Sequence, residues 1–214
     1  MLSKRLNKIA ELVDENKVVY DVGSDHGLLP CFLVLNNKCP KVYAVDNKKG
    51  PLNKAIANIE YYGLQDKVIP ILSNGIEDIK DDVDIITLAG MGFYTVKDIL
   101  DNKDLTKYEK IIVQVNKDTS LLRQWISDNE YSIIDECVVH DDFYYEIVVF
   151  NASKGPKLSP LELKYGPINL RNKTDTFLQY LAYKRLKLAS VNASAHKIEY
   201  EETIEEINDI ICNV

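Results

Sequence analysis

Residues able to do chemistry gather in the short segment that follows the first apolar run of the chain. The sequence VVYDVGSDHGLLP, residues 18–30, places two acids, a histidine and two glycines within seven positions: Asp21, Gly23, Asp25, His26 and Gly27. Glycines let the backbone approach a ligand, and a following helix points free N–H groups at it. A dinucleotide-binding loop reads GxGxxG, and carboxylates beside its pyrophosphate would repel it. The segment therefore indicates a ligand that carries an ammonium or sulfonium group.

Two further segments extend the pattern to S-adenosylmethionine, which has an ammonium, a carboxylate, a sulfonium, a ribose and an adenine. Asp46 follows the second apolar run, 25 residues after Asp21, close to the spacing expected for an acid that binds ribose hydroxyls. Asn74 and Gly75 follow the third run and offer the adenine an amide and a close backbone. The alternative is a structural turn with a solvated acid. The expected cofactor contacts are Asp21, Gly23, Ser24, Gly27, Asp46, Asn47, Asn74, Gly75, Ala89, Gly90 and Met91.

A sheet must bring these segments together, and the spacing of apolar runs predicts one. Such runs alternate with helical patterns, which indicates a mostly parallel sheet with helices on both faces and ligands beyond its carboxyl edge. Two last runs lie too close together for a crossover helix, so they predict an antiparallel hairpin at the sheet edge. The expected strands are 18–22, 41–45, 68–72, 84–89, 111–115, 131–139 and 144–150, and the expected helices are 3–16, 28–35, 51–62, 93–100 and 119–129.

The C-terminal quarter of the chain has a different pattern. Residues 151–160, NASKGPKLSP, are rich in turn formers and indicate a linker. Residues 174–190 and 196–212 predict two long helices that form an antiparallel hairpin resembling a coiled coil. Their seams are Phe177, Leu181, Leu188 and Val191 on the first helix, and Tyr200, Ile204, Ile207 and Ile211 on the second. We therefore expect a cofactor-binding domain over 1–155 and a helical domain over 156–214.

Composition limits the class of protein. The chain has 214 residues, of which 46% are hydrophobic and 28% charged, as expected for a globular protein with a substantial core. No apolar run approaches the roughly 20 residues of a membrane span, and the amphipathic N-terminus does not resemble a signal peptide. The four cysteines form no CxxC pair and the three histidines lie far apart, so neither zinc nor disulfides are expected. We expect a cytoplasmic monomer without a metal ion.

The charge distribution indicates where RNA would bind. The net charge of −7 argues against a general nucleic-acid binder, yet residues 151–200 hold nine basic and three acidic residues, a local charge of +6. Lysines and arginines hold RNA through its phosphates. The alternative is a solvated helix face. The residues expected to contact RNA are Lys4, Arg5, Lys8, Arg171, Lys173, Lys184, Arg185 and Lys187.

Several segments together resemble the bacterial tRNA adenine-22 N1-methyltransferases. They are LSKRL (2–6), DVGSDHGLLP (21–30), AVDNKKGPL (44–52), LAGMG (88–92), QVN (114–116), FYYEIVV (143–149) and YGPINL (165–170). The resemblance spans nearly the whole chain. It implies a Rossmann-like class I methyltransferase fold with a coiled-coil-like C-terminal domain, S-adenosylmethionine as methyl donor, and tRNA as the partner methylated at N1 of adenine 22. The chain departs from the family pattern at Asn74, Phe93 and Val115.

This reaction demands positioning more than proton removal. Adenine N1 already has a lone pair, its methylated product is cationic, and its place on the pairing edge requires an unpaired or flipped base. We expect Asp25 to orient the base or stabilise the cation, with His26 beside it, and Asn116 to contact the adenine edge. The alternatives are a helix-capping role for Asp25 and a packing or capping role for His26.

Two rival classes share parts of this pattern, and a small-molecule methyltransferase lies between them. A nicotinamide-dependent oxidoreductase has the same type of sheet but needs the pyrophosphate loop that this sequence lacks. A non-catalytic RNA-binding protein could retain the S-adenosylmethionine pocket. A small-molecule methyltransferase is disfavoured by the basic helical pair.

Overall fold

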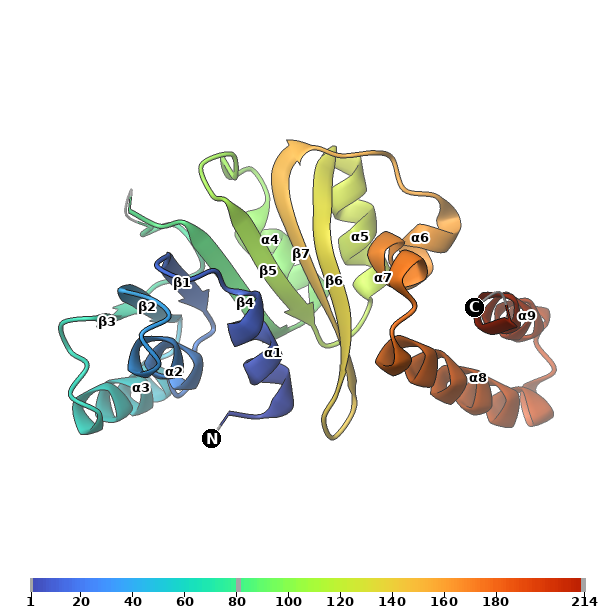
Figure 1. The fold of residues 1–214 in the computed structure, drawn as a ribbon, viewed down its shortest axis with the longest axis horizontal. Coiled ribbons are helices and arrows are strands. Elements are labelled where there is room, and N and C mark those ends of the chain that lie inside the picture. The colour runs from blue at the N-terminus through green and yellow to red at the C-terminus, as the bar shows by residue number, and fades with distance from the viewer. Residues whose placement is uncertain (1, 80–81, 213–214) are drawn as a thin grey trace.

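The computed structural model describes residues 2–79 and 82–212, and a seven-stranded sheet forms the centre of this part of the chain (Figure 1). The strand order is β3-β2-β1-β4-β5-β7-β6. The first five strands pair in parallel, whereas β7 is antiparallel to both β5 and β6, so the mostly parallel sheet with an antiparallel edge hairpin is confirmed. The strands are β1 (Val18–Val22), β2 (Lys41–Asp46), β3 (Val68–Leu72), β4 (Ile85–Met91), β5 (Lys110–Val115), β6 (Tyr131–His140) and β7 (Tyr144–Lys154).

Helices cover both faces of the sheet. One hydrophobic cluster joins the strands to α1 (Lys4–Leu12), α2 (Leu28–Leu35) and α3 (Lys49–Tyr61). The cluster on the opposite face joins them to α4 (Phe93–Leu100) and α5 (Thr119–Asp128). Because strands β2, β1 and β4 meet in the middle of this order, their carboxyl ends lie at the point where the path of the chain across the sheet reverses, the usual ligand position in such folds.

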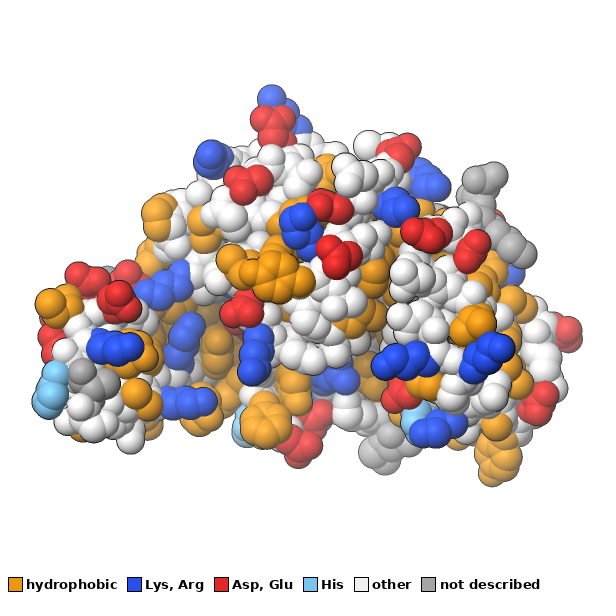
Figure 2. All heavy atoms as spheres, turned by 180° about the vertical axis from the view of Figure 1, so that it is seen from behind, with side chains coloured by type: hydrophobic (Ala, Val, Ile, Leu, Met, Phe, Trp, Pro, Cys, Tyr) orange, Lys and Arg blue, Asp and Glu red, His pale blue; other side chains and the backbone are white. Residues whose placement is uncertain are grey.

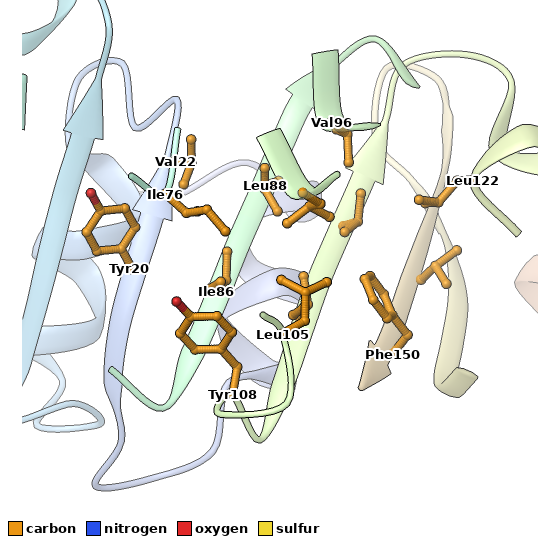
Figure 3. Packing of buried hydrophobic residues seen from close by; sticks show 14 of the residues in the cluster. Tyr20, Val22, Ile76, Ile86, Leu88, Val96, Leu105, Tyr108, Leu122 and Phe150 are labelled. Carbon is orange, nitrogen blue, oxygen red and sulfur yellow. The ribbon is translucent and has the colours of Figure 1, made fainter. Parts of the chain in front are cut away.

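Alternation along the strands explains why the sheet is buried on both faces. In β1, Tyr20 and Val22 point into the cluster with α4 and α5, while Val19 belongs to the cluster on the other face. Figure 3 shows Tyr20 and Val22 in one layer with Ile86 of the next strand. Successive side chains of a strand point to opposite faces, so apolar residues at both parities require helices on both sides.

The segment between the sheet and the long helices is more ordered than predicted. Strand β7 continues to Lys154, so the expected linker over 151–160 is only partly a loop. Helix α6 (Pro160–Tyr165) begins with a capping box, in which the Ser159 hydroxyl and the Glu162 carboxylate accept each other's backbone N–H groups. Helix α7 (Pro167–Asn172) follows after Gly166. The SPLE sequence is a capping-box signal, and it identifies α6 once the Pro at the first helical position is recognised.

The two C-terminal helices, α8 (Asp175–Ala195) and α9 (Ile198–Cys212), run antiparallel as predicted. Asn192 bonds Glu201 near the connection, and Arg185 bonds Asn208 farther from it. The buried seam is formed by Phe177, Leu181, Ile207 and Ile210. The predicted seam differs in part, because Val191 is 46% exposed and Ile210 is buried while the predicted Ile204 and Ile211 are only partly buried. The domain division at 155 and 156 remains a prediction.

A buried cluster of charges ties the C-terminal helices to the sheet. The Arg123 side chain in α5 is fully buried, and it donates to Glu136 of β6 at 2.6 Å and to Glu146 of β7 at 2.8 Å. The Tyr180 hydroxyl of α8 donates to the other Glu146 oxygen at 3.2 Å. The Ile168 N–H of α7 donates to Glu136 at 3.1 Å. Five elements thus share one set of charges and hydrogen bonds.

Candidate active site

A cavity of about 480 Å³ lies at the carboxyl ends of β1 to β4, against one side of α4. Its volume falls in the range of small-molecule sites. We call it the acidic cavity, because four of its lining residues are acids and one is a lysine. It is lined by Val22, Gly23, Asp25, Asp46, Asn47, Lys48, Pro51, Ser73, Asn74, Gly75, Glu77, Met91, Thr95, Asp98 and Ile99.

The Asp46 carboxylate is held in place by the backbone around it. Its two oxygens accept the N–H groups of Lys48 at 2.9 Å and of Asp25 at 3.3 Å. The residue is only 9% exposed and lines the acidic cavity. Each carboxylate oxygen accepts more than one hydrogen bond, so lone pairs remain for two vicinal hydroxyls. Fixed orientation and free acceptor capacity suit a ribose.

The loop after β1 packs against the Met91 side chain of the cavity wall. Gly23 has a φ of +72°, and a Cβ placed there would lie 2.3 Å from the Met91 methyl carbon. The N–H groups of Gly23 and Ser24 both donate to the Val45 carbonyl at 2.9 Å, which holds the loop against the end of β2. The positive φ therefore favours glycine at this position, and a larger residue would also have to displace the end of the Met91 side chain.

The charge of the acidic cavity indicates the kind of ligand that it binds. The wall contains four acids and one lysine, so it attracts a cation and repels phosphate groups. The acids are Asp25, Asp46, Glu77 and Asp98, and the lysine is Lys48. The Ser73 hydroxyl is buried in this wall and interacts with the Tyr20 hydroxyl behind it. The cavity fits S-adenosylmethionine in size and charge, and its wall opposes a dinucleotide pyrophosphate.

Asp21 is placed behind this wall, and it is not a lining residue. It is buried and accepts a hydrogen bond from the Thr87 hydroxyl at 2.5 Å. Burial raises the pKa of its carboxyl from 3.8 to about 6, although the Thr87 bond opposes the shift. Arg5 also lowers this pKa, and the Asp46 charge raises it. Asp21 is thus a buried, weakened acid at the end of β1, next to the loop that carries Gly23.

We expect Asp21→Asn to stabilise the protein at neutral pH. A buried acid with a raised pKa binds its proton more tightly in the folded state, so stability is lost as the pH rises from about 4 through about 6. Asparagine does not titrate, so the variant avoids this loss. The free energy of unfolding of Asp21→Asn should exceed that of the wild type by about 1–2 kcal/mol at pH 7.5, with no difference near pH 4. Denaturant unfolding at both pH values tests this, with the exposed Asp66→Asn as control. Equal stability at pH 7.5 would contradict it.

The other side of the site is built from the ends of β4 and β5. Gly90, with a φ of +79°, lies at a register shift between these strands. Its N–H donates to the Gln114 side-chain oxygen at 3.1 Å, and its carbonyl accepts the Asn116 amide at 2.8 Å. The Asn116 N–H also donates to the Met91 carbonyl at 2.8 Å. The Asn116 side chain is therefore oriented by the same turn that forms the cavity wall.

Arg5 supports this turn from helix α1. Its guanidinium donates to the Gln114 side-chain oxygen at 2.6 Å and lies 5.5 Å from the centre of the Tyr145 ring. The predicted role of Arg5 in binding RNA phosphates stays a prediction, while its contacts are those of a half-buried residue of the site. Its neighbours differ, because Lys4 is exposed and Lys8 pairs with Glu11 at 2.9 Å.

Asp25 and His26, which were predicted to lie at the base together with Asn116, differ in position. Asp25 lines the acidic cavity and has a φ of +50°. It does not cap the next helix, since the N-cap of α2 is Gly27 without a side-chain bond. The His26 ring lies 3.3 Å from the Lys54 ammonium and 3.5 Å from Asp25. The His26 side chain is 41% exposed and is not among the cavity-lining residues.

The predicted RNA-binding residues of the C-terminal helices make different contacts in the structure. Arg185 bonds Asn208, and Lys173 bonds the Ile210 carbonyl, so both take part in contacts with α9. Arg171 is exposed and bonds Asn172. Lys184 and Lys187 instead line a second cleft beside Asn116.

The sequence patterns missed part of the cavity wall. Helix α4 contributes Thr95, Asp98 and Ile99, which lie three and four residues apart on one helical face. The polar Thr95 and Asp98 beside the buried Val96 were the sequence signal that this face of α4 borders a cavity. Ser73 and Glu77, next to the predicted Asn74 and Gly75, carry no motif. Of the predicted cofactor contacts, Gly23, Asp46, Asn47, Asn74, Gly75 and Met91 line the cavity, whereas Asp21, Ser24, Gly27, Ala89 and Gly90 lie behind or beside it.

Two other kinds of site are absent from residues 2–79 and 82–212. The His, Cys, Asp and Glu side chains of these ranges form no group of three or more able to hold a metal ion. No helix within the same ranges has the length and apolar character needed to cross a membrane.

The sheet order and the acid-lined cavity at its carboxyl edge define a Rossmann-like methyltransferase domain. The family described as "Methyltransferase domain" matches residues 2–148. The chain is 33% identical to the tRNA (adenine(22)-N(1))-methyltransferase of Bacillus subtilis strain 168, over 97% of this chain and 93% of that protein. It belongs to this methyltransferase family.

Solved structures support the same grouping. A Streptococcus pneumoniae protein crystallised in complex with S-adenosyl-L-methionine is 30% identical, with a TM-score of 0.89 over 99% of this chain and 100% of that one. M. capricolum TrmK, in complex with the cofactor product S-adenosyl-homocysteine, is 32% identical, with a TM-score of 0.84 over 99% of this chain and 98% of that one.

Proposed function

We propose that the protein is an S-adenosylmethionine-dependent tRNA methyltransferase that modifies N1 of adenine 22. The observation that carries this proposal is the acidic cavity, whose wall at Met91 is hydrogen-bonded to Asn116 on the opposite side of the turn. A donor site and a polar group for an acceptor base are therefore joined by one turn of the backbone. Membership of the family supports tRNA as substrate and adenine 22 as the target.

The residues of the acidic cavity divide the work of holding the donor. Asp46 binds the ribose hydroxyls, and Asn74 with Gly75 receives the adenine. Asp25 and the remaining acids favour the cationic end, with Asp21 adding negative charge from behind the wall. The bound S-adenosylmethionine supplies an electrophilic methyl group. This assignment keeps the predicted ribose and adenine contacts and gives the cationic end of the donor to Asp25, because Asp21 does not line the acidic cavity.

The protein's own contribution to the reaction is placement and electrostatics. The target N1 has a lone pair, so no side chain has to remove a proton before attack. Asn116, fixed by Gly90 and Met91, orients the edge of the flipped base. Asp25 stabilises the positive charge that the base acquires. Neither task requires His26.

We expect Asn116→Ala to lower kcat about 10- to 100-fold, because a positioned amide is lost while the cavity wall is kept. Affinity for S-adenosylhomocysteine should stay within about threefold, since Asn116 does not line the acidic cavity. Single-turnover methylation and calorimetry measure the two quantities separately. A parallel loss of both would instead assign Asn116 to the donor site.

Transfer of labelled methyl groups to unmodified tRNA tests the function itself. Wild-type protein should label a tRNA transcript that has adenine at nucleotide 22, and a matched transcript with guanine at that nucleotide should remain unlabelled. Nuclease digestion and mass spectrometry should place the label on N1 of the adenine. Labelling of the guanine-containing transcript, or the absence of labelling on any tRNA, would refute the proposal.

A further inference from the structure

A second cleft, of about 750 Å³, opens between the end of β5, the turn of the β6–β7 hairpin and helix α8. Lysines account for four of its six charged lining residues, and we call it the lysine cleft. Figure 2 shows Lys and Arg side chains gathered on the rear face, where the C-terminal helices lie beside the sheet. The cleft is lined by Val115, Asn116, Lys117, Asp118, Thr119, Ser120, Phe143, Tyr144, Tyr145, Glu146, Lys164, Tyr180, Lys184 and Lys187.

The charges of the lysine cleft are only partly neutralised. Lys164 pairs with Glu206, and Glu146 pairs with Arg123. Lys184 has no ion pair within the described part of the chain, although it is partly buried. Its ammonium lies 5.4 Å from the centre of the Tyr165 ring and 5.8 Å from that of Tyr180. Such contacts offset only part of the cost of burying a charge.

Burial also lowers the pKa of Lys184, and the nearby Glu146 charge opposes this shift. A partly buried ammonium without a carboxylate partner costs the free protein stability. A bound anion removes that cost, and Lys117 and Lys187 stand in the same cleft to share it. The chemistry of the cleft therefore points to an anionic ligand.

Aromatic rings at the rim narrow the identity of that anion. Phe143, at the hairpin turn, is 68% exposed. Tyr145 is partly exposed, whereas Tyr144 is stacked on His140 at 4.4 Å and packs against Tyr180. Exposed rings next to lysines bind single-stranded nucleic acid, in which bases stack and phosphates pair with cations. A simple polyanion would make no use of the rings.

We propose that the lysine cleft holds the tRNA strand next to the target adenine, with a phosphate at Lys184 and Lys187 and a neighbouring base on Phe143 or Tyr145. This inference rests on the proposed function and specifies how its substrate is held. The cleft is in the right place, because Asn116 lines it and is bonded to the Met91 carbonyl of the acidic cavity. A strand in the cleft thus delivers its flipped base to the turn shared by both sites.

Lys184→Met separates this role from a structural one. We expect the variant to raise the Kd for unmodified tRNA about 5- to 20-fold at about 0.15 M salt and to reduce the salt slope of binding by about one. Its thermal midpoint should stay level or rise, because an unpaired buried charge is removed. Affinity for S-adenosylhomocysteine should not change. Lys67→Met, exposed before β3 at the opposite edge of the sheet, is the matched control.

A photocrosslink locates the RNA. Benzoylphenylalanine introduced in place of Phe143 should crosslink to tRNA within a few nucleotides of the methylated adenine. If the wild type methylates tRNA but Lys184→Met keeps its affinity and salt slope, or the crosslinks fall in a remote arm, the cleft assignment is overturned and the proposed function stands. If the wild type methylates no tRNA, the proposed function itself fails.

Discussion

Arg123→Met is expected to lower the free energy of unfolding by about 3–5 kcal/mol, the typical cost of removing one partner from a buried ion pair. The Arg123 side chain is fully buried between Glu136 and Glu146, and methionine fills a similar length without a charge. Glu136 would then stay buried with only the Ile168 N–H to satisfy one oxygen. Because Tyr180 bonds Glu146, the attachment of α8 should weaken as well. Denaturant unfolding at pH 7 measures the loss.

Two further variants identify the cause of that loss. Arg171→Met removes an exposed arginine from α7 and should change the free energy of unfolding by less than about 0.5 kcal/mol. The triple variant Arg123→Met, Glu136→Gln, Glu146→Gln removes the stranded charges and should recover a large part of the stability. A single variant that unfolds like the wild type would mean that the three charges are not energetically coupled.

Asp46→Asn is expected to weaken binding of S-adenosylhomocysteine about 30- to 100-fold, a loss of about 2–3 kcal/mol. Both Asp46 oxygens accept backbone N–H groups, from Lys48 and from Asp25. An asparagine amide would turn a donor toward one of those N–H groups or toward a ribose hydroxyl, so a repulsive contact arises in either orientation. Isothermal titration calorimetry measures the change.

The effect should be confined to the donor. Affinity of Asp46→Asn for tRNA is expected to stay within about twofold, because Asp46 does not line the lysine cleft. Asp66→Asn, at an exposed position before β3, provides the control for charge removal alone. Wild-type affinity in Asp46→Asn would exclude this carboxylate as the ribose ligand and would leave the acidic cavity without its central contact.

Much of the sheet and of its covering helices was predictable, because the sequence patterns that mark these elements are local. β1, β3, α2 and α4 begin and end at the predicted residues, since apolar runs there are bounded by glycine, asparagine, serine or charged residues. Helix α1 ends at Leu12 and not at Asn16, because Val13 is already extended. The short helix α7, between Gly166 and Lys173, has too few residues for a periodic pattern to appear.

The site was only partly predictable, because its geometry depends on contacts between distant segments. Asp46 was identified by its place after a strand, and the cavity wall includes it. Asp21 carried the same type of signal, yet the Thr87 hydroxyl, 66 residues away, holds it behind that wall. The partners of Arg123 and the burial of Lys184 depend in the same way on how the hairpin and α8 pack. No local pattern encodes such contacts.

The turn at Gly90 and Met91 lies between the acidic cavity and the lysine cleft, and Asn116 is hydrogen-bonded to it. The wall of the acidic cavity is mainly anionic, whereas that of the lysine cleft is mainly cationic. A phosphodiester entering from the cationic side meets repulsion at this boundary, whereas an uncharged nucleobase does not. If tRNA binds as proposed, this boundary favours the uncharged heterocycle over the phosphate backbone to which it is attached.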